Sequence, residues 1–326
     1  MIGEPPARWL TARGDIPLDR PVVAGILNIT PDSFSDGARF LAPDAALRHA
    51  ASLIEQGADV LDLGAESTRP GRPDPVPVEE EWRRLEPVLA SLTRAWPNLP
   101  LSIDTVKSVT ARRALDAGAW VINDVSGLRL DAAIADACAA HGAGLVLMHS
   151  RGTFGEMATY DHARYTDVVT EVAAELDDAV GRAEARGVDR SRIVLDPGLG
   201  FAKRPEHNLA VLGALEHLVA RGFPVMVGPS RKRFLGELTG GRPPMERDGA
   251  TATACVVAWE RGARIFRVHN VALVREALDV AAAIGRPGRP GRPGRIDRPD
   301  RPGARYSCPA VRPSAGPPGA GEGGAA

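Results

Sequence analysis

Short apolar runs alternate with longer amphipathic stretches over residues 21–285. The apolar runs are rich in Val, Ile and Leu and are bounded by turn residues, a pattern that predicts buried strands. They lie at residues 22–29, 59–65, 101–105, 120–126, 144–149, 192–198, 224–230 and 265–270. Helical periodicity follows each of them, at residues 44–57, 78–95, 108–118, 131–142, 165–187, 206–222, 249–262 and 271–285. Many of these stretches end in glycine, as helix C-termini often do.

Eight strands, each followed by a helix, are the elements of a (β/α)8 TIM barrel, an α/β fold of about 250 residues. A doubly wound open sheet is the alternative, but such sheets usually have fewer strands, and no GxGxxG motif follows the first run. We therefore predict a single barrel domain over residues 21–285, preceded by an N-terminal extension at residues 1–20.

Polar side chains stand at the C-terminal end of every predicted strand. In a TIM barrel these ends form the rim that carries the active site. A helix N-cap explains one or two such residues, but not a polar group at all eight ends. In strand order the ends carry Asn28, Asp62 with Glu66, Asp104, Asn123 with Asp124, His149, Asp196, Ser230, and Arg267 with His269.

Two kinds of polar group collect on this rim. Asp104, Asn123 and Asp196 supply carboxylates and an amide, which suit a flat heterocycle that presents several N–H donors. The second kind is cationic and suits phosphate, which barrels commonly hold at their last two strand ends. Its members are Arg69, Arg231, Lys232, Arg233, Arg267 and His269.

Composition and charge restrict the remaining possibilities. The net charge of −1 gives no general electrostatic case for a nucleic-acid or acidic-membrane partner. Three scattered cysteines and the lack of a signal-like or membrane-spanning run favour a cytoplasmic protein. Residues 286–326 are rich in Pro, Gly and Arg, and we expect a disordered tail there. A weak tether to nucleic acid or phosphate is the alternative for this tail.

The ordered motifs resemble the dihydropteroate synthase family over residues 22–285. They are "GILNITPDSFSDGA" (25–38), "DVLDLGAESTRPG" (59–71), "SIDT" (102–105), "INDVSG" (122–127), "LMHSRG" (147–152), "LDPGLGFAK" (195–203), "GPSRKRFLG" (228–236) and "RVHNV" (267–271). Members of this family are TIM barrels, usually homodimers, that join 4-aminobenzoate to hydroxymethyl-dihydropterin diphosphate and release pyrophosphate. Sulfonamides mimic 4-aminobenzoate and are the expected inhibitors.

The resemblance implies a role for each matching residue. The pterin is expected to contact Asp104, Asn123, Asp196, Lys232, Met148 and Gly228. The diphosphate is expected to contact Asn28, Arg69, Arg267 and His269, with Asn28 as the protein ligand of Mg²⁺. The 4-aminobenzoate slot is expected to involve Thr68, Pro70, Phe201, Phe34 and Arg233. Catalytic roles fall to Asp36, Lys232 and Asp104, with Asp36 on a lid formed by residues 30–37.

One departure affects the aminobenzoate slot, because Arg233 stands where many relatives carry Ser. Two other functions use a similar barrel. A methyltetrahydrofolate:corrinoid methyltransferase would share the acidic pterin set but has no use for the cationic motifs. A non-catalytic pterin-binding paralogue would show erosion in the first loop, in "STRPG" or in "SRK", and all three are intact.

Overall fold

The computed structural model describes residues 6–11, 13–29, 42–66 and 75–284. Eight parallel strands form one sheet in the order β8-β7-β6-β5-β4-β3-β10-β9. They are β3 (Val22–Asn28), β4 (Val60–Gly64), β5 (Leu101–Asp104), β6 (Val121–Asp124), β7 (Gly144–Met148), β8 (Ile193–Asp196), β9 (Met226–Val227) and β10 (Ile265–Val268). A parallel bridge between Leu195 and Val225 joins the two ends of the sheet. The predicted TIM barrel is therefore confirmed.

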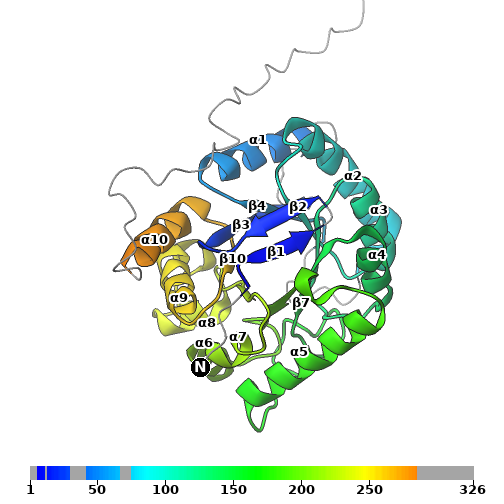
Figure 1. Ribbon diagram of the computed structural model, residues 1–326. Coiled ribbons are helices and arrows are strands. Elements are labelled where there is room, and N and C mark those ends of the chain that lie inside the picture. Colours follow the sequence, from blue (N-terminus) through cyan, green and yellow to red (C-terminus); the bar gives the residue numbers. More distant parts are fainter. Residues whose placement is uncertain (1–5, 12, 30–41, 67–74, 285–326) are drawn as a thin grey trace, which may run out of the picture. The chain divides into compact units, whose positions relative to one another are not determined.

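Helices surround the sheet on its outer side (Figure 1). They are α1 (Ala42–Glu55), α2 (Val78–Ala95), α3 (Ser108–Asp116), α4 (Ala133–His141), α5 (Val168–Ala185), α6 (Pro205–Gly213), α7 (Glu216–Val219), α8 (Arg233–Leu238), α9 (Asp248–Glu260) and α10 (Val271–Ile284). The C-terminal residue of α4 is followed by Gly142 in the left-handed conformation, with φ 58° and ψ 32°. This is the glycine stop that the sequence predicts.

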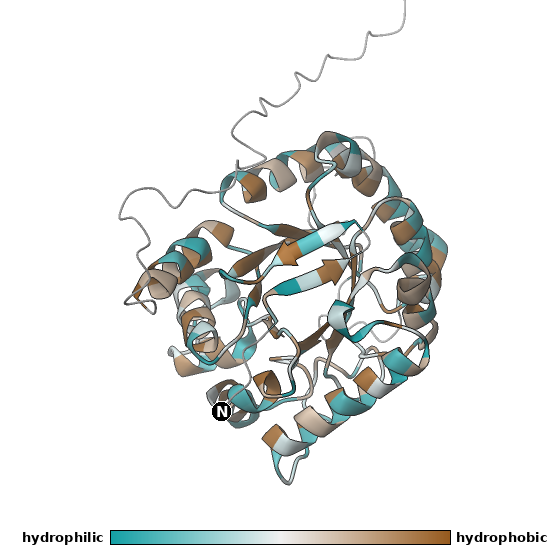
Figure 2. Ribbon diagram, in the orientation of Figure 1, coloured by the Kyte–Doolittle hydropathy of each residue, from teal (hydrophilic) through white to brown (hydrophobic). Residues whose placement is uncertain are grey.

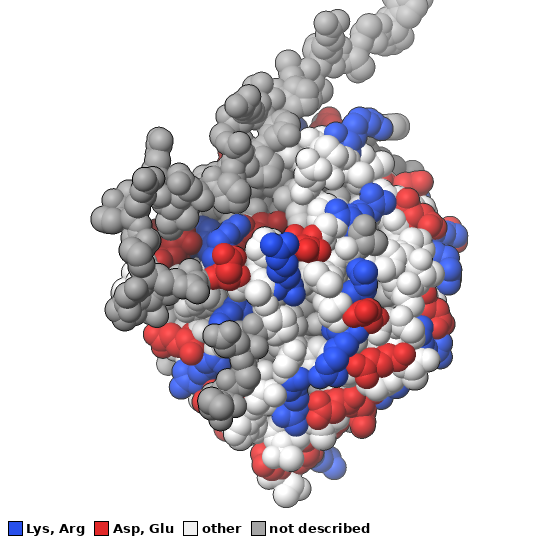
Figure 3. Space-filling view, viewed as in Figure 1, with Lys and Arg blue, Asp and Glu red and all other residues white. Residues whose placement is uncertain are grey.

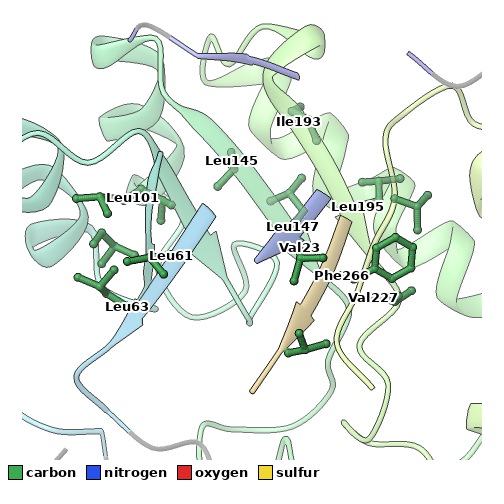
Figure 4. Packing of buried hydrophobic residues seen from close by; sticks show 14 of the residues in the cluster. Val23, Leu61, Leu63, Leu101, Leu145, Leu147, Ile193, Leu195, Val227 and Phe266 are labelled. Carbon is green, nitrogen blue, oxygen red and sulfur yellow. The ribbon is translucent and has the colours of Figure 1, made fainter. Parts of the chain in front are cut away.

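Alternate residues of each strand face the helices and form the main apolar core. Figure 4 shows Leu61, Leu63, Leu145, Leu147 and Phe266 among the side chains of this layer, and each of them is fully buried. Figure 2 shows the hydrophobic strands at the centre and the mixed polarity of the surrounding helices. Residues of the opposite parity point into the barrel, because successive side chains of a strand alternate between its two faces.

A two-stranded hairpin precedes the barrel and was not predicted. It consists of β1 (Arg8–Thr11) and β2 (Gly14–Pro17), paired antiparallel, and it lies in front of the barrel strands in Figure 1. Trp9 and Ile16 of the hairpin share one apolar cluster with Val121, Val146 and Val194, which stand in the N-terminal halves of barrel strands. Gly144 makes room for the indole, since a Cβ there would lie 2.9 Å from the Trp9 ring. The hairpin therefore closes the N-terminal end of the barrel.

Replacing Trp9 with phenylalanine is expected to lower the free energy of unfolding by about 1–3 kcal/mol. Trp9 is 2% exposed, and its indole Nε1 donates a hydrogen bond of 2.7 Å to the Arg192 carbonyl. Phenylalanine leaves that carbonyl without its partner and creates a small cavity. Urea denaturation checks the loss. Ligand affinity should be unchanged because the indole lies at the end of the barrel opposite the rim, and a variant with altered affinity but normal stability would contradict this assignment.

The structure differs from the sequence prediction in two further places. The helix predicted at residues 206–222 is divided into α6 and α7 after Gly213, a residue of low helix propensity. The strand predicted at residues 224–230 is reduced to Met226–Val227, and the additional helix α8 follows it. The predicted tail at residues 286–326 lies outside the described residues.

The surface and helices give two further observations. On the face drawn in Figure 3, Lys and Arg side chains are interspersed with Asp and Glu, consistent with the small net charge. Among the described residues, every helix is too short or too polar to cross a membrane.

Candidate active site

In four of the barrel strands the inward-facing residues change from apolar to polar over a two-residue step. Val60 is followed by Asp62, Val121 by Asn123, Val194 by Asp196 and Ile265 by Arg267. A two-residue step keeps a side chain on the same face of its strand. All four apolar members belong to the cluster beneath the hairpin. The polar members therefore stand above them, inside the C-terminal half of the barrel.

Arg267 connects two carboxylates from neighbouring strands. Its Nε donates to Asp62 at 2.6 Å, and its Nη2 donates to Asp104 at 2.7 Å. Asp62 also accepts a hydrogen bond of 2.6 Å from the Ser102 hydroxyl and a longer one of 3.5 Å from the Asn123 amide nitrogen. The Arg267 side chain remains 21% exposed, whereas that of Asp62 is 3% exposed. Two carboxylates thus hold Arg267, and part of its side chain stays accessible.

Asn123 provides an acceptor without a partner. Its Oδ1 is buried and makes no hydrogen bond to any residue in the described part of the chain. A buried amide oxygen that lacks a partner costs about 1–3 kcal/mol, so such an atom inside a polar barrel is suited to a ligand donor. Asp104 stands beside Asn123 in the register of β5 and β6. Together they present acceptors for adjacent N–H groups.

Asp104 and Asp196 have carboxyl groups with raised pKa values. Burial raises the pKa of Asp104 to about 7, against the opposing effect of Arg267. Burial likewise raises the pKa of Asp196 to about 6, although its Oδ1 accepts a 2.7 Å hydrogen bond from the Gly198 amide and Lys232 lies nearby. Ligand N–H groups that bond to the ionised carboxylates would lower both pKa values again.

Lys232 interacts with the charges of the same polar group. Burial and then Arg267 lower the pKa of its ammonium to about 8, while Asp196 and Asp104 act in the opposite direction. Its Nζ stands 3.9 Å from the centre of the Phe201 ring, a cation–π contact. Phe201 belongs to an apolar cluster with Val106, Val125, Phe154, Met157 and Met148. The polar barrel interior is therefore bordered by an apolar wall suited to flat rings.

Comparison with known proteins agrees with this geometry. Residues 24–269 match the pterin binding enzyme family. This chain belongs to the pterin binding enzyme family. It is 47% identical to the dihydropteroate synthase of Mycobacterium leprae over 268 residues, covering 80% of this chain and 92% of that protein.

Solved structures give the same relationship for this pterin binding enzyme. The structure of Xanthomonas albilineans dihydropteroate synthase with 4-aminobenzoic acid is 45% identical to this chain and superposes with a TM-score of 0.79. The match covers 86% of this chain and 98% of the Xanthomonas chain. A structure of the Xanthomonas albilineans enzyme in complex with 7,8-dihydropteroate matches at 40% identity with a TM-score of 0.75, covering 86% of this chain and 99% of its own.

Several predicted site residues are brought together in the pterin binding barrel. Asp104, Asn123, Asp196 and Lys232 carry the polar interactions, and Met148 belongs to the apolar wall. Gly228 follows β9, where a Cβ would lie 3.9 Å from Arg267 Cβ. Asn28 ends β3 in register with Gly64. His269 follows β10, with its Nδ1 2.8 Å from the Ser230 hydroxyl oxygen.

Two arginines of the "SRKR" motif, which the sequence places in the cationic group, contact other side chains of the protein. Arg231 makes two hydrogen bonds to Asp248, of 2.7 and 2.9 Å, and its charge is paired there. Its place among the phosphate-binding cations stays a prediction. Arg233 donates 2.9 Å to the Tyr160 hydroxyl and stacks over that ring at 3.8 Å. Its proposed contact with 4-aminobenzoate stays a prediction.

Five predicted residues fall outside the described part of this pterin binding enzyme. They are Phe34, Asp36, Thr68, Arg69 and Pro70, in the segments 30–41 and 67–74. Their roles remain predictions from the resemblance.

Sequence reasoning overlooked the part played by Asp62 and Lys203. Asp62 was noted only as a strand end, although it shares the inward parity of Asp104 and supports Arg267. That parity was the available signal. Lys203 lies on the segment after β8 and is fully buried. Only the fold reveals the burial, because the sequence around it reads as a loop.

Proposed function

We propose that this chain is a dihydropteroate synthase. It condenses 6-hydroxymethyl-7,8-dihydropterin diphosphate with 4-aminobenzoate to give 7,8-dihydropteroate and pyrophosphate. The observation that carries the proposal is the buried acceptor set of Asp104, Asn123 and Asp196, in which Asn123 Oδ1 lacks a partner among the described residues. Relatives of 45% and 40% identity have been solved with 4-aminobenzoic acid and 7,8-dihydropteroate, respectively.

The pterin ring would lie inside the C-terminal half of the barrel. Its N–H and amino groups are donors, and paired donors on one edge fit a carboxylate in the way a guanidinium does. Asp196 and Asp104 would accept from such edges in their ionised forms, and Asn123 Oδ1 would accept one further hydrogen bond. Lys232 would donate to a ring acceptor, and Met148 would pack against the ring face.

The reaction forms a carbon–nitrogen bond and breaks a carbon–oxygen bond. The amine of 4-aminobenzoate attacks the methylene carbon, pyrophosphate departs with the bonding electron pair, and the new amine loses a proton to solvent. Negative charge grows on the leaving group, so preorganised cations stabilise it, an effect worth several kcal/mol. Arg267 and His269 are the described residues proposed for this role. Asp36 and Arg69 are proposed to complete the site.

Magnesium is proposed as the metal that accompanies the diphosphate. The described residues contain no group of three or more His, Cys, Asp or Glu side chains that could hold a metal by themselves. Mg²⁺ is typically held by one or two protein oxygens together with substrate phosphates and water. The Asn28 side chain, partly exposed at the end of β3, offers one such hard oxygen. When bound, the ion would neutralise charge on the departing pyrophosphate.

Replacing Asn28 with alanine is expected to weaken magnesium-dependent binding of the dihydropterin diphosphate roughly tenfold. Calorimetric titration with and without Mg²⁺ measures this effect without requiring turnover. In EDTA the variant and the natural protein should bind the ligand equally. The dihydropterin alcohol, which lacks the diphosphate, is the control ligand and should bind both proteins alike. Equal loss in EDTA would show that Asn28 acts without the metal.

We further propose a cytoplasmic homodimer. Cys138 and Cys255 are buried free thiols, which supports a reducing compartment. Leu209 on α6 and Leu238 on α8 are 42% and 54% exposed, and they offer apolar surface for a second copy. Light scattering on the eluted protein measures the mass directly, and a monomer at micromolar concentration would exclude the dimer.

The proposed function is tested by incubating the protein with dihydropterin diphosphate, 4-aminobenzoate and Mg²⁺. Chromatography should detect dihydropteroate together with an equal amount of pyrophosphate, and a sulfonamide should compete with 4-aminobenzoate. Tight pterin binding without product would instead indicate a non-catalytic paralogue. Methyl transfer from methyltetrahydrofolate to a corrinoid would indicate the methyltransferase alternative. Absence of pterin binding would overturn the whole assignment.

A further inference from the structure

The turn after β8, residues 197–203, has an unusual backbone. Gly198, Gly200 and Ala202 all have positive φ angles, of 67°, 80° and 43°. Ala202 is strained because residues with a Cβ rarely adopt this region. Gly198 permits a very close approach, since a Cβ there would lie 1.9 Å from the His149 carbonyl oxygen. Such a turn persists only where surrounding contacts determine it.

Lys203 makes hydrogen bonds to the backbone of the turn from its inner side. Its side chain is fully buried, and its Nζ lies 3.3 Å from the Gly198 carbonyl, 3.2 Å from the Phe201 carbonyl and 2.8 Å from His149 Nδ1. Burial lowers the pKa of Lys203 to about 7. In its protonated form the group has three N–H donors, and three acceptors surround it here. The two carbonyls belong to the turn itself, so the amine holds the turn closed from its inner side.

His149 is oriented to accept from Lys203. Its Nε2 lies 3.1 Å from Glu175 on α5. Burial, followed by the charge of Lys203, lowers the pKa of His149 to about 4, so the imidazole is neutral near pH 7. With its proton on Nε2 toward Glu175, the ring presents a lone pair on Nδ1. Glu175 in turn pairs with Arg151.

A second element fixes the strained residue. The Tyr165 hydroxyl donates 3.0 Å to the Ala202 carbonyl, and the Ala202 amide donates 2.8 Å to the Met157 carbonyl. Arg151 lies over the Tyr165 ring, 4.0 Å from its centre. The turn is therefore tied to the segment between β7 and α5, which restrains it from outside.

The turn contacts the reactive part of the barrel at three points. The Gly198 amide donates to Asp196, the Phe201 ring lies under Lys232 Nζ, and Gly200 packs against the Lys232 stem. A Cβ on Gly200 would stand 2.8 Å from Lys232 Cδ, so the Lys232 stem packs closely against the backbone there. Displacing the turn would move both the cation and its aromatic support.

We infer that Lys203 is a positioning residue that holds the 197–203 turn and thereby places Phe201 and Lys232 for 4-aminobenzoate. It acts through these residues and does not itself touch the substrates. This inference rests on the proposed synthase function for its kinetic consequence. Its structural consequence, a turn held by the buried amine, stands independently of that function.

The test replaces Lys203 with methionine, which keeps the unbranched apolar stem and removes the donors. Arg275→Met is the matched control, because Arg275 is also a buried cation but pairs with Asp59 and the Pro21 carbonyl at the other end of the barrel. Hydrogen exchange of the peptide containing residues 198–203 should accelerate at least about tenfold in Lys203→Met and stay unchanged in Arg275→Met. Unchanged exchange in Lys203→Met would overturn the inference without reference to activity.

Kinetics provide the second measurement. In Lys203→Met the KM for 4-aminobenzoate should rise roughly tenfold or more, because Phe201 and Lys232 shape that slot. The Kd of the dihydropterin diphosphate should rise less, because Asp104 and Asn123 of other strands also contact the pterin. A normal KM for 4-aminobenzoate in Lys203→Met would overturn the positioning role. An inactive natural protein would refute the synthase function, and the exchange result would still decide the role of Lys203.

Paired substitutions at His149 keep the test decisive if Lys203→Met fails to fold. Asparagine can place its carboxamide oxygen where the imidazole Nδ1 stands, whereas leucine supplies no acceptor. His149→Asn should therefore retain slow exchange and a near-normal KM for 4-aminobenzoate. His149→Leu should reproduce the changes expected of Lys203→Met. Identical behaviour of the two variants would show that the hydrogen bond to Lys203 does not hold the turn.

Discussion

Replacing Lys232 with alanine is expected to lower kcat/KM for dihydropteroate formation by at least about a thousandfold. The ammonium group lies over the Phe201 ring and interacts with the charges of Asp196 and Asp104, in the region proposed for both substrates. Removing it deletes a donor to the pterin and the cation that shapes the aminobenzoate slot. Steady-state kinetics on both substrates measure the loss.

Stability should change little in the same variant. Burial lowers the pKa of Lys232 to about 8, below the usual value of 10.5, so folding disfavours its charged form at pH 7. Deleting the side chain relieves that penalty and offsets the lost packing. The Tm is therefore expected to remain within a few degrees of the natural protein. Lys232→Arg keeps the charge with a different shape and should have intermediate activity. Natural turnover combined with severe unfolding in Lys232→Ala would refute the assignment.

Replacing Arg267 with methionine is expected to destabilise the protein by about 2–4 kcal/mol at pH 8, allowing for the partial exposure of the guanidinium. Arg267 pairs with Asp62 and Asp104, whose side chains are only 3% and 17% exposed. Without the arginine these carboxylates lose their shared cation inside the barrel. Arg267→Lys retains the charge but lacks the planar fork, and it should lose less.

The loss of stability in Arg267→Met should depend on pH. The pKa of Asp104 is about 7 in the natural protein, above its ordinary value of 3.8. Between pH 3.8 and pH 7 the folded state therefore binds a proton that the unfolded state does not. The contribution of Asp104 to stability falls as the pH rises through this range. Without Arg267 the pKa rises further. At pH 5 Asp104 is protonated in both proteins and adds no deficit. At pH 8 its ionised form is the favoured one in the natural protein and is disfavoured in the variant, because it has lost its cation. Urea denaturation at the two pH values should therefore give the larger difference at pH 8. An equal difference would show that Asp104 does not carry the effect.

The Arg267 site illustrates how far sequence reasoning reached. The alternation of residues along β10 placed Arg267 and His269 on one strand face, and the rim argument placed Asp104 and Asn123 at the same end of the barrel. The pairing of Arg267 with Asp62 could not be derived in this way. Asp62 and Arg267 are 205 residues apart, and their contact depends on β3, β4 and β10 being neighbours in the sheet.

Local patterns determined most strands and helices of the barrel, because strand and helix periodicities depend on neighbouring residues. They also determined which ends of the strands carry the polar side chains and, through motif resemblance, the family. The tertiary structure decided which of those side chains are paired. It directed Arg231 to Asp248, buried Lys203 beside His149, and placed the N-terminal hairpin under the barrel. The physical reason is that burial and charge pairing arise between segments distant in the chain, and only closure of the barrel brings those segments into contact.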